Sequence, residues 1–145
     1  MARIESTIVV SKSVEDTFAF LNEAESHAHF IPNMAELKQT SDGMFGKVGT
    51  TARGVLSYFG LVKVPVQYEI IEHQPVSKLA MKELMGPVAF KDGYILNRQN
   101  GGTEIKFWLE LNPTGWTKIF KPFASLIGKI HAYETLRNLK REFIK

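Results

Sequence analysis

The chain of 145 residues contains no cysteine. This absence excludes disulfide bonds, thiolate metal sites and a cysteine nucleophile. The sequence also has no run of about 18 uninterrupted apolar residues, which is the length that a membrane-spanning helix needs. Its first residues, Met1–Ser6, lack the apolar segment of a signal peptide. We therefore expect a soluble, cytoplasmic protein.

The sequence also lacks the short motifs of common catalytic and nucleotide-binding sites. It has no His-Glu-x-x-His zinc motif, no glycine-rich phosphate loop and no nucleophile elbow. Its four histidines are His27, His29, His73 and His131. His27 and His29 lie two positions apart in a predicted helix, so they point to different sides and cannot bind one metal together. We expect no metal and no cofactor, and we interpret each histidine as a surface or hydrogen-bonded core residue.

The composition is that of a globular protein. Hydrophobic residues make up 44% of the chain and charged residues 23%, which are ordinary values. A chain of this length typically buries about 70% of the surface of its unfolded form, so a full core needs no disulfide or metal. The sequence shows no repeat or linker, and we predict a single domain over residues 1–145.

The last thirty residues carry a long apolar stripe. Steps of three and four over this length predict a helix, which would extend roughly 40 Å at 1.5 Å per residue. Such a helix needs a long surface on which to pack. The residues of the stripe are Ile119, Phe120, Phe123, Leu126, Ile127, Ile130, Tyr133, Leu136, Leu139 and Phe143.

The net charge of +3 is concentrated in the same segment. From Trp116 to Lys145 there are seven cationic residues and two acidic ones, a balance of +5. One interpretation is a solvated outer face of the helix. The other is peripheral contact with an anionic membrane or with a protein partner. We do not expect nucleic-acid binding, because the basic residues share a helix whose other face must be buried.

Before this helix, the pattern predicts one strand, two short helices and six strands. Residues 3–11 alternate like a strand, Ser13 begins a helix with Asp16 three residues after the cap, and a second helix over 23–30 ends before Pro32. The predicted strands that follow cover 35–41, 50–59, 64–73, 78–84, 88–98 and 103–112. Short turns, such as Asn100-Gly101-Gly102, favour antiparallel pairing. We predict an α+β fold in the order β-α-α-β6-α, with a curved sheet of about seven strands around the C-terminal helix.

Several local patterns resemble those of the START/polyketide-cyclase superfamily, whose fold is called the helix-grip. Ile4–Leu21 is similar to its opening strand and helix, and His29–Pro32 resembles its aromatic-apolar-proline helix end. Tyr68–Pro75 followed by Lys78-Leu79 is similar to one of its strand pairs. The segment 102–105, Gly-Thr-Glu-Ile, matches the start of its last strand. The resemblance covers essentially the whole chain.

The resemblance implies a large apolar cavity between the sheet and the last helix. In this superfamily such cavities are used for lipids, sterols, polyketides and similar ligands. No particular reaction is implied, because members include carriers, cyclases and chaperone regulators. Our first hypothesis is binding or transport of a hydrophobic small molecule or lipid. The alternative is a cyclase or dehydratase that uses an acid/base residue in the cavity, and a second alternative is a membrane or protein adapter that acts through the basic helix.

Strand alternation predicts which side chains face the helix. Leu79 and Met81 share one inward face, and Ile105, Phe107 and Leu109 share another. One slip in register would invert any assignment, and Gly93 is a candidate site for a bulge. The same apolar faces also fit an ordinary core. The predicted ligand-binding residues are Leu56, Tyr58, Tyr68, Ile70, Met81, Phe90, Asp92, Tyr94, Phe107, Phe123 and Ile127.

Asp92 is the candidate catalytic residue. Alternation places its carboxylate between Phe90 and Tyr94, where burial would raise its pKa as a general acid requires. The alternative is that Gly93 twists the strand and Asp92 meets solvent or a cation. Glu83 lies near a strand end, where we expect it at the rim of the cavity. The side chain of Arg53 could face into the cavity or away from it.

The predicted cavity lies under one section of the last helix. Pro122 and Gly128 bracket this section, Phe123–Ile127. Proline bends or begins a helix, and glycine costs it about 1 kcal/mol relative to alanine. We predict that the cavity opens by movement of this section.

Overall fold

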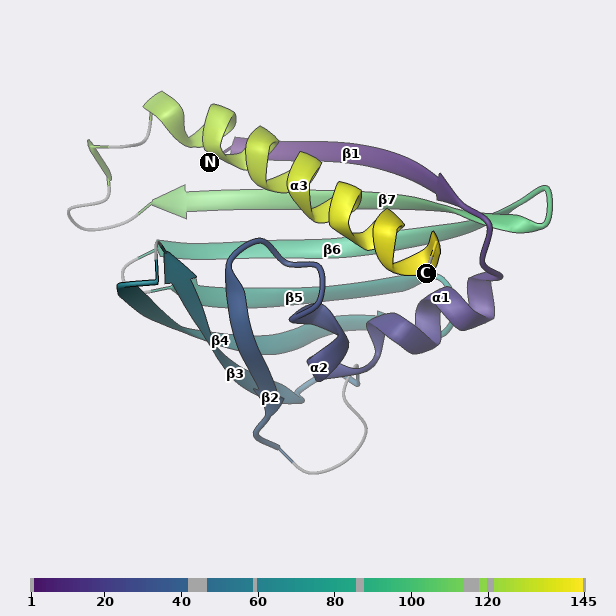
Figure 1. Ribbon diagram of the computed structural model, residues 1–145, viewed down its shortest axis with the longest axis horizontal. Helices are drawn as coiled ribbons and strands as arrows, with labels where there is room; N and C mark the ends of the chain where they lie inside the picture. The colour runs from purple at the N-terminus through teal and green to yellow at the C-terminus, as the bar shows by residue number, and fades with distance from the viewer. Residues whose placement is uncertain are drawn as a thin grey trace.

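A computed structural model describes residues 2–41, 47–58, 60–85, 88–113, 118–119 and 122–144. The elements in chain order are β1 (Ala2–Val10), α1 (Val14–Leu21), α2 (Ala24–His27), β2 (Met34–Gln39), β3 (Thr51–Tyr58), β4 (Val62–Gln74), β5 (Lys78–Met85), β6 (Val88–Gln99), β7 (Gly102–Pro113) and α3 (Ala124–Ile144) (Figure 1). This order confirms the predicted β-α-α-β6-α arrangement.

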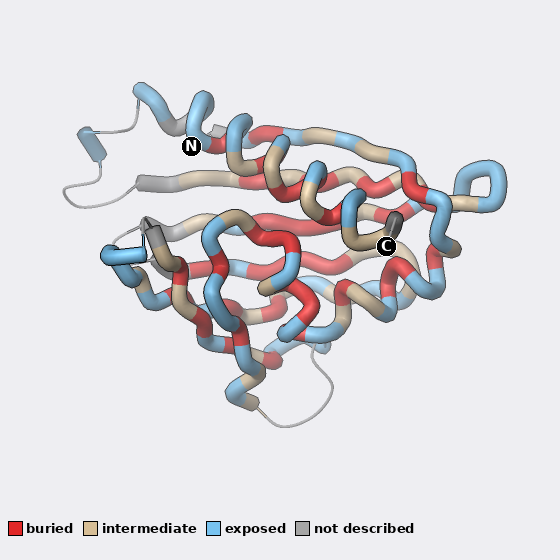
Figure 2. The backbone as a smooth tube through the Cα atoms, viewed as in Figure 1, coloured by how far each residue is buried: buried red, intermediate tan, exposed pale blue. Residues whose placement is uncertain are grey.

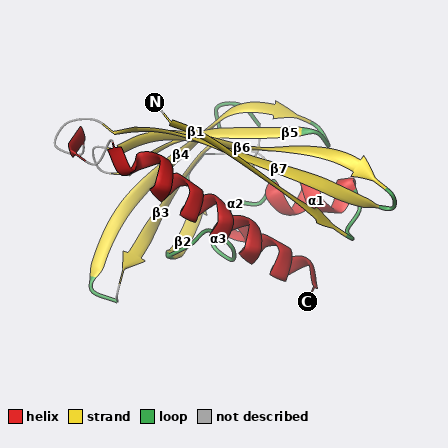
Figure 3. Ribbon diagram, turned by 90° about the horizontal axis from the view of Figure 1, so that it is seen from above, coloured by secondary structure: helices red, strands yellow, loops and turns green. Residues whose placement is uncertain are grey.

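The strands form one seven-stranded sheet in the order β1-β7-β6-β5-β4-β3-β2. Every neighbouring pair is antiparallel. The sheet curves, and α3 runs along one of its faces (Figure 3). The sheet is open, because β1 and β2 do not pair with each other. The predicted α+β helix-grip fold is therefore confirmed.

The first helix begins as its cap predicts. The Asp16 backbone N–H donates a hydrogen bond to the Ser13 side-chain oxygen at 3.1 Å, which satisfies one of the free donors of the first turn. The second helix, α2, is shorter than the segment 23–30 that was predicted. The predicted start of the last helix, at Trp116, lies outside the described residues, but α3 itself begins only at Ala124, so the α-helix is shorter than predicted.

Gly93, the candidate site for a bulge, lies in unbroken strand pairing. Pairing of β6 with both neighbours continues through Gly93 without a shift, whereas the register breaks between Met34 and Glu36 and between Ile70 and Glu72. Gly93 instead lies beneath the indole of Trp108 on β7, and a Cβ atom there would come within 2.7 Å of the ring. The glycine is thus explained by an aromatic side chain packed over the outer face of the sheet.

The buried side of α3 differs from the apolar stripe that the sequence predicts. Its buried line runs through Gly128, Ala132, Leu136 and Leu139, and the start of the helix is largely exposed (Figure 2). A Cβ atom at Gly128 would lie 2.5 Å from the Ile4 Cδ1 atom. Because Gly128 and Ala132 are small, this part of the helix lies close to the sheet and its larger side chains turn outward. The exposed members of the stripe are Ile119, Phe123, Leu126, Ile127, Ile130 and Tyr133.

The C-terminal half of α3 is fixed by aromatic packing. The rings of Phe20 in α1 and Phe143 in α3 lie 5.2 Å apart. The Asn138 side chain donates a hydrogen bond to the Phe30 carbonyl oxygen at 3.1 Å.

Within the described ranges, no helix has the length and apolar character needed to cross a membrane.

Candidate functional site

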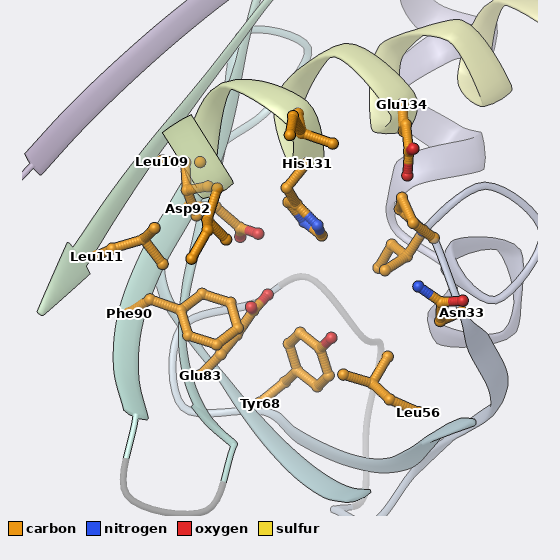
Figure 4. Close-up of a pocket in the computed structure, with 15 residues that line it drawn as sticks. Asn33, Leu56, Tyr68, Glu83, Phe90, Asp92, Leu109, Leu111, His131 and Glu134 are labelled. Atoms are coloured by element: carbon orange, nitrogen blue, oxygen red, sulfur yellow. The ribbon is translucent and has the colours of Figure 1, made fainter. Parts of the chain in front are cut away.

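A cavity of about 220 Å³ lies between the sheet and the N-terminal half of α3 (Figure 4). Its walls come from β3 to β7, from the segment 31–33 that precedes β2, and from residues 127–134 of α3. Most of the lining is apolar, as is usual for sites that bind small molecules. The apolar wall includes Ile31, Leu56, Phe90, Leu109, Leu111 and Ile130.

The eleven predicted ligand-binding residues fall into four groups. Those that line the cavity are Leu56, Tyr68, Phe90, Asp92 and Ile127. Those that are buried in the core and do not line it are Ile70, Met81, Tyr94 and Phe107. Phe123 is 56% exposed and does not line it. The side chain of Tyr58 lies outside the described part of the chain.

Aromatic packing explains why half of the inward face is core. Tyr94 packs against Phe107 at 5.2 Å and against Phe30 at 6.3 Å between ring centroids. His27 from α2 lies 6.0 Å from the Tyr94 ring, and its Nε2 atom lies 2.8 Å from the Leu21 carbonyl oxygen. The short helices therefore fill the space beneath the C-terminal half of α3. The cavity lies beneath the N-terminal half.

Two carboxyl groups point into this space from neighbouring strands. The register pairs Glu83 of β5 with Phe90 of β6 and Met81 with Asp92, which makes Glu83 and Asp92 diagonal neighbours on the inward face. Their side chains point into the cavity (Figure 4). Glu83 is 3% exposed and Asp92 4% exposed. This burial excludes the alternative in which Asp92 meets solvent. The expectation that Glu83 lies at the rim is wrong, because its side chain is buried in the cavity wall.

The two carboxyls lie close enough that a proton on one of them can form a hydrogen bond to the other. Each group also has a buried oxygen without a hydrogen-bond partner, Oε1 of Glu83 and Oδ1 of Asp92. Among the described residues that line the cavity there is no lysine or arginine, and Arg53 is exposed on β3. The pair therefore has unused hydrogen-bonding capacity and no cationic partner there.

Burial changes the protonation of this pair. Burial raises the pKa of Asp92 to about 7, although the hydrogen bond with Glu83 acts in the opposite direction. The pKa of Glu83 is raised well above its ordinary value by burial, and further by the charge of Asp92 and the hydrogen bond between them. Adjacent buried carboxylates do not both ionise readily. Just above neutral pH the pair therefore holds one proton, mainly on Glu83, and carries one negative charge.

Two titratable side chains from α3 face the same cavity. The imidazole ring of His131 points into it (Figure 4). Burial lowers the pKa of His131 to about 4, so the ring is neutral at pH 7. Glu134, one turn further along α3, also lines the cavity and is partly buried. In the part of the chain that is described, no group of three or more His, Cys, Asp or Glu residues is arranged to hold a metal ion.

Strand parity contained a signal for Glu83 that the sequence prediction did not use. Leu79 and Met81 were predicted to face inward, and continuing that alternation places Glu83 on the same face. His131 had no comparable signal. It lies one residue from the buried Ala132, and its contact with the cavity depends on how α3 is rotated on the sheet.

The pair makes stability depend on pH. Because the folded state retains a proton that an unfolded Asp releases near its ordinary pKa of 3.8, the free energy of unfolding should fall as pH rises from about 4 to about 7. The asparagine side chain of the Asp92→Asn variant is neutral, so folding buries no charge at this position. We expect the substitution to reduce this fall and to raise the free energy of unfolding at about pH 8 by on the order of 2–4 kcal/mol.

Urea unfolding at a series of pH values measures this effect. Glu36→Gln is the matched control, because Glu36 is exposed on β2, and it should keep the pH dependence of the unsubstituted protein. An Asp92→Asn protein that is less stable than the parent at high pH would show that the charge is compensated in the native state.

Three solved structures illustrate what this chain is similar to. Protein CV1439 from Chromobacterium violaceum gives a TM-score of 0.78 at 13% identity, over 99% of this chain and 97% of that one. Ara h 8.0201 gives 0.74 at 12% identity, over 99% and 97%. The di-domain ARO/CYC BexL from the BE-7585A biosynthetic pathway gives 0.77 at 12% identity, over 97% of this chain and 46% of BexL.

Compared by sequence, the chain matches no protein-family profile and no curated protein. At the identities given above, a structural likeness shows the fold and not the activity. Element order, open antiparallel sheet and long closing helix agree with these neighbours over nearly the whole chain. The likeness shows a helix-grip fold, which is the fold that the sequence resemblance implied.

Proposed function

We propose that the protein binds a small, largely apolar molecule in the cavity beneath the N-terminal half of α3. The observation that carries this proposal is an apolar cavity of about 220 Å³ with two buried carboxyls in its wall. Protein interiors are normally close-packed and satisfy their buried polar groups. A space of this size lined by unpartnered carboxyl oxygens departs from both rules. A bound molecule that fills the space and donates hydrogen bonds to these oxygens would remove both departures.

The exposure of the lining residues indicates where a ligand enters. Ile127 and Ile130 line the cavity and are 50% and 51% exposed. Asn33 also lines it and is exposed, with a positive φ of 65°. The opening therefore lies between α3 and the segment before β2. The sequence predicts that the section Phe123–Ile127 covers the cavity and moves to open it, but the part of α3 that lines the cavity is 127–134. Movement of the section before Gly128 would widen this opening at one end only.

A substitution at the opening tests the proposal. We expect Ile130→Trp to fill the entrance and to weaken binding of octanol by about tenfold or more, since a bulky ring would take the volume that the ligand needs. Isothermal titration calorimetry gives the affinity. Leu126→Trp is the matched control, because Leu126 lies on the same helix and is 59% exposed but does not line the cavity. Absence of octanol binding to the parent protein, or equal binding by both variants, would contradict the proposal.

A second candidate function is acid–base catalysis of the cyclase or dehydratase type. The shared proton of Glu83 and Asp92 favours it, because such a pair offers a base and an acid side by side near neutral pH. Asp92 would remove a proton from carbon next to a substrate carbonyl. The new carbon–carbon bond would form at the carbon of a second carbonyl, whose oxygen would take the proton held by Glu83. Loss of the resulting hydroxyl group together with a proton from the adjacent carbon would then release water.

Turnover of a linear poly-β-keto thioester, followed by mass spectrometry for loss of water, measures this activity. We expect Asp92→Asn to lower the rate by about a hundredfold or more, as for loss of a general base, and Glu36→Gln to leave it unchanged. Equal rates in Asp92→Asn and the parent protein would exclude Asp92 as the base.

We also propose that the start of α3 contacts anionic membrane surfaces. The exposed apolar residues Leu126 and Tyr133 lie on the same helix as the exposed Lys129, and the exposed Phe123 directly precedes it. This combination is typical of helices that lie in the membrane interface. The entrance of the cavity adjoins this face. A ligand that partitions into lipid would then reach the cavity without crossing water.

Co-sedimentation with vesicles of phosphatidylserine and phosphatidylcholine measures this contact. We expect binding at low salt that high salt weakens, and we expect Lys129→Glu to reduce it several-fold more than Lys140→Glu. The second variant makes the same charge change on an exposed residue of the C-terminal half. No sedimentation at low salt would exclude the contact.

A further inference from the structure

We propose that the ligand of this cavity is an apolar molecule whose polar end is a protonated amine, and that Glu83 and Asp92 hold this end and exclude carboxylates. This inference rests on the proposed binding function and narrows its ligand class. It would exclude fatty acids, which are otherwise obvious candidates for an apolar cavity of this fold.

The carboxyl oxygens define what the polar end must supply. Oε1 of Glu83 and Oδ1 of Asp92 are buried without a hydrogen-bond partner, and both residues line the cavity. Between them the two carboxyls hold one proton, which is used in the bond that joins them. The free oxygens therefore need donors from outside. An ammonium group supplies three donors, a hydroxyl group supplies one, and a carboxylate supplies none.

The charges around the cavity point to the same ligand class. The titratable groups that face the pair are Tyr68 from β4, Tyr94 from β6, and His131 and Glu134 from α3. Burial, together with the charges of Asp92 and Glu83, raises the pKa of Tyr94 well above its ordinary value, so it stays neutral. Burial keeps the His131 ring neutral at pH 7, as its pKa of about 4 requires.

The described lining thus carries negative charge from the pair and from Glu134, with no cationic side chain to balance it. A carboxylate ligand would have to enter beside a like charge and lose its hydration. A cationic ligand would instead form charge-assisted hydrogen bonds with the carboxyls, and these are stronger than neutral ones.

The size of the cavity limits the size of the apolar part of the ligand. Its volume of about 220 Å³ is below the range of roughly 300–1,000 Å³ that is typical for drug-sized ligands. A short alkyl chain or a single ring system suits such a space. Its apolar end would lie against Leu56, Leu109 and Ile130.

A series with one chain length and three head groups tests the inference. We would titrate octylamine, octanol and octanoate into the protein by calorimetry at about pH 8, where the pair is charged. The expected order is octylamine, then octanol, then octanoate. We expect about ten- to a hundredfold in affinity between amine and alcohol, from the charge-assisted bonds.

The variants locate the charge that is responsible. In the isosteric double variant Glu83→Gln/Asp92→Asn, the ratio of octylamine affinity to octanol affinity should fall close to one. The control variant Glu36→Gln should keep the ratio of the parent protein. If Glu134→Gln alone removed the preference, the charge of Glu134 and not that of the pair would account for it, and the inference would be overturned.

The parent protein also provides a test that needs no variant. Because protonation of Asp92 neutralises the pair, the preference for octylamine over octanol should decrease about tenfold or more between about pH 8 and about pH 5.5. A preference that is unchanged over this range, or octanoate binding as tightly as octylamine at the higher pH, would overturn the inference. In either case octanol binding would leave the proposed function intact, whereas absence of binding by all three probes would contradict that function itself.

Discussion

The close contact of α3 with the edge of the sheet determines where this protein has a core and where it has a cavity. Gly128 faces Ile4 and Leu111 so closely that a Cβ atom would lie 2.5 Å and 3.3 Å from their Cδ1 atoms. Beyond this point the helix is buried through Ala132, Leu136 and Leu139. The helix is thus held against β1 and β7 and against the aromatic packing at its C-terminal end. Its N-terminal half spans the curved sheet without filling the space beneath it.

Element order was the most predictable property of the chain. Alternation, turn residues and the cap at Ser13 are local signals, and each reports on a structure that forms within a few residues. The rotation of α3 was not predictable in the same way. A wide apolar stripe is compatible with several rotations, and the choice among them depends on how close the helix axis comes to the sheet. Gly128 decides that distance, but the sequence alone indicated only local weakening of the helix.

In the candidate site, too, local sequence patterns predict some features, and others depend on tertiary packing. Strand parity placed Asp92 inward and, if continued from Met81, would have placed Glu83 beside it. Parity could not separate residues that line a cavity from residues that pack in a core, since Tyr94 and Tyr68 face the same way. That separation depends on Phe30 and His27, which come from a distant segment and fill one end of the inward face. His131 enters the site through the rotation of α3, which is a tertiary property.

The carboxyl pair links occupancy of the cavity to stability. Two buried acids without a cationic partner among the described lining residues destabilise the folded protein when one of them ionises. Apolar residues of similar size would pack the same positions at lower cost, so stability alone does not account for the pair. An occupant that donates hydrogen bonds to the free oxygens offsets the cost, and by mass action it stabilises the folded state. The charge that lowers the stability of the folded protein is therefore the feature that would make its ligand binding selective.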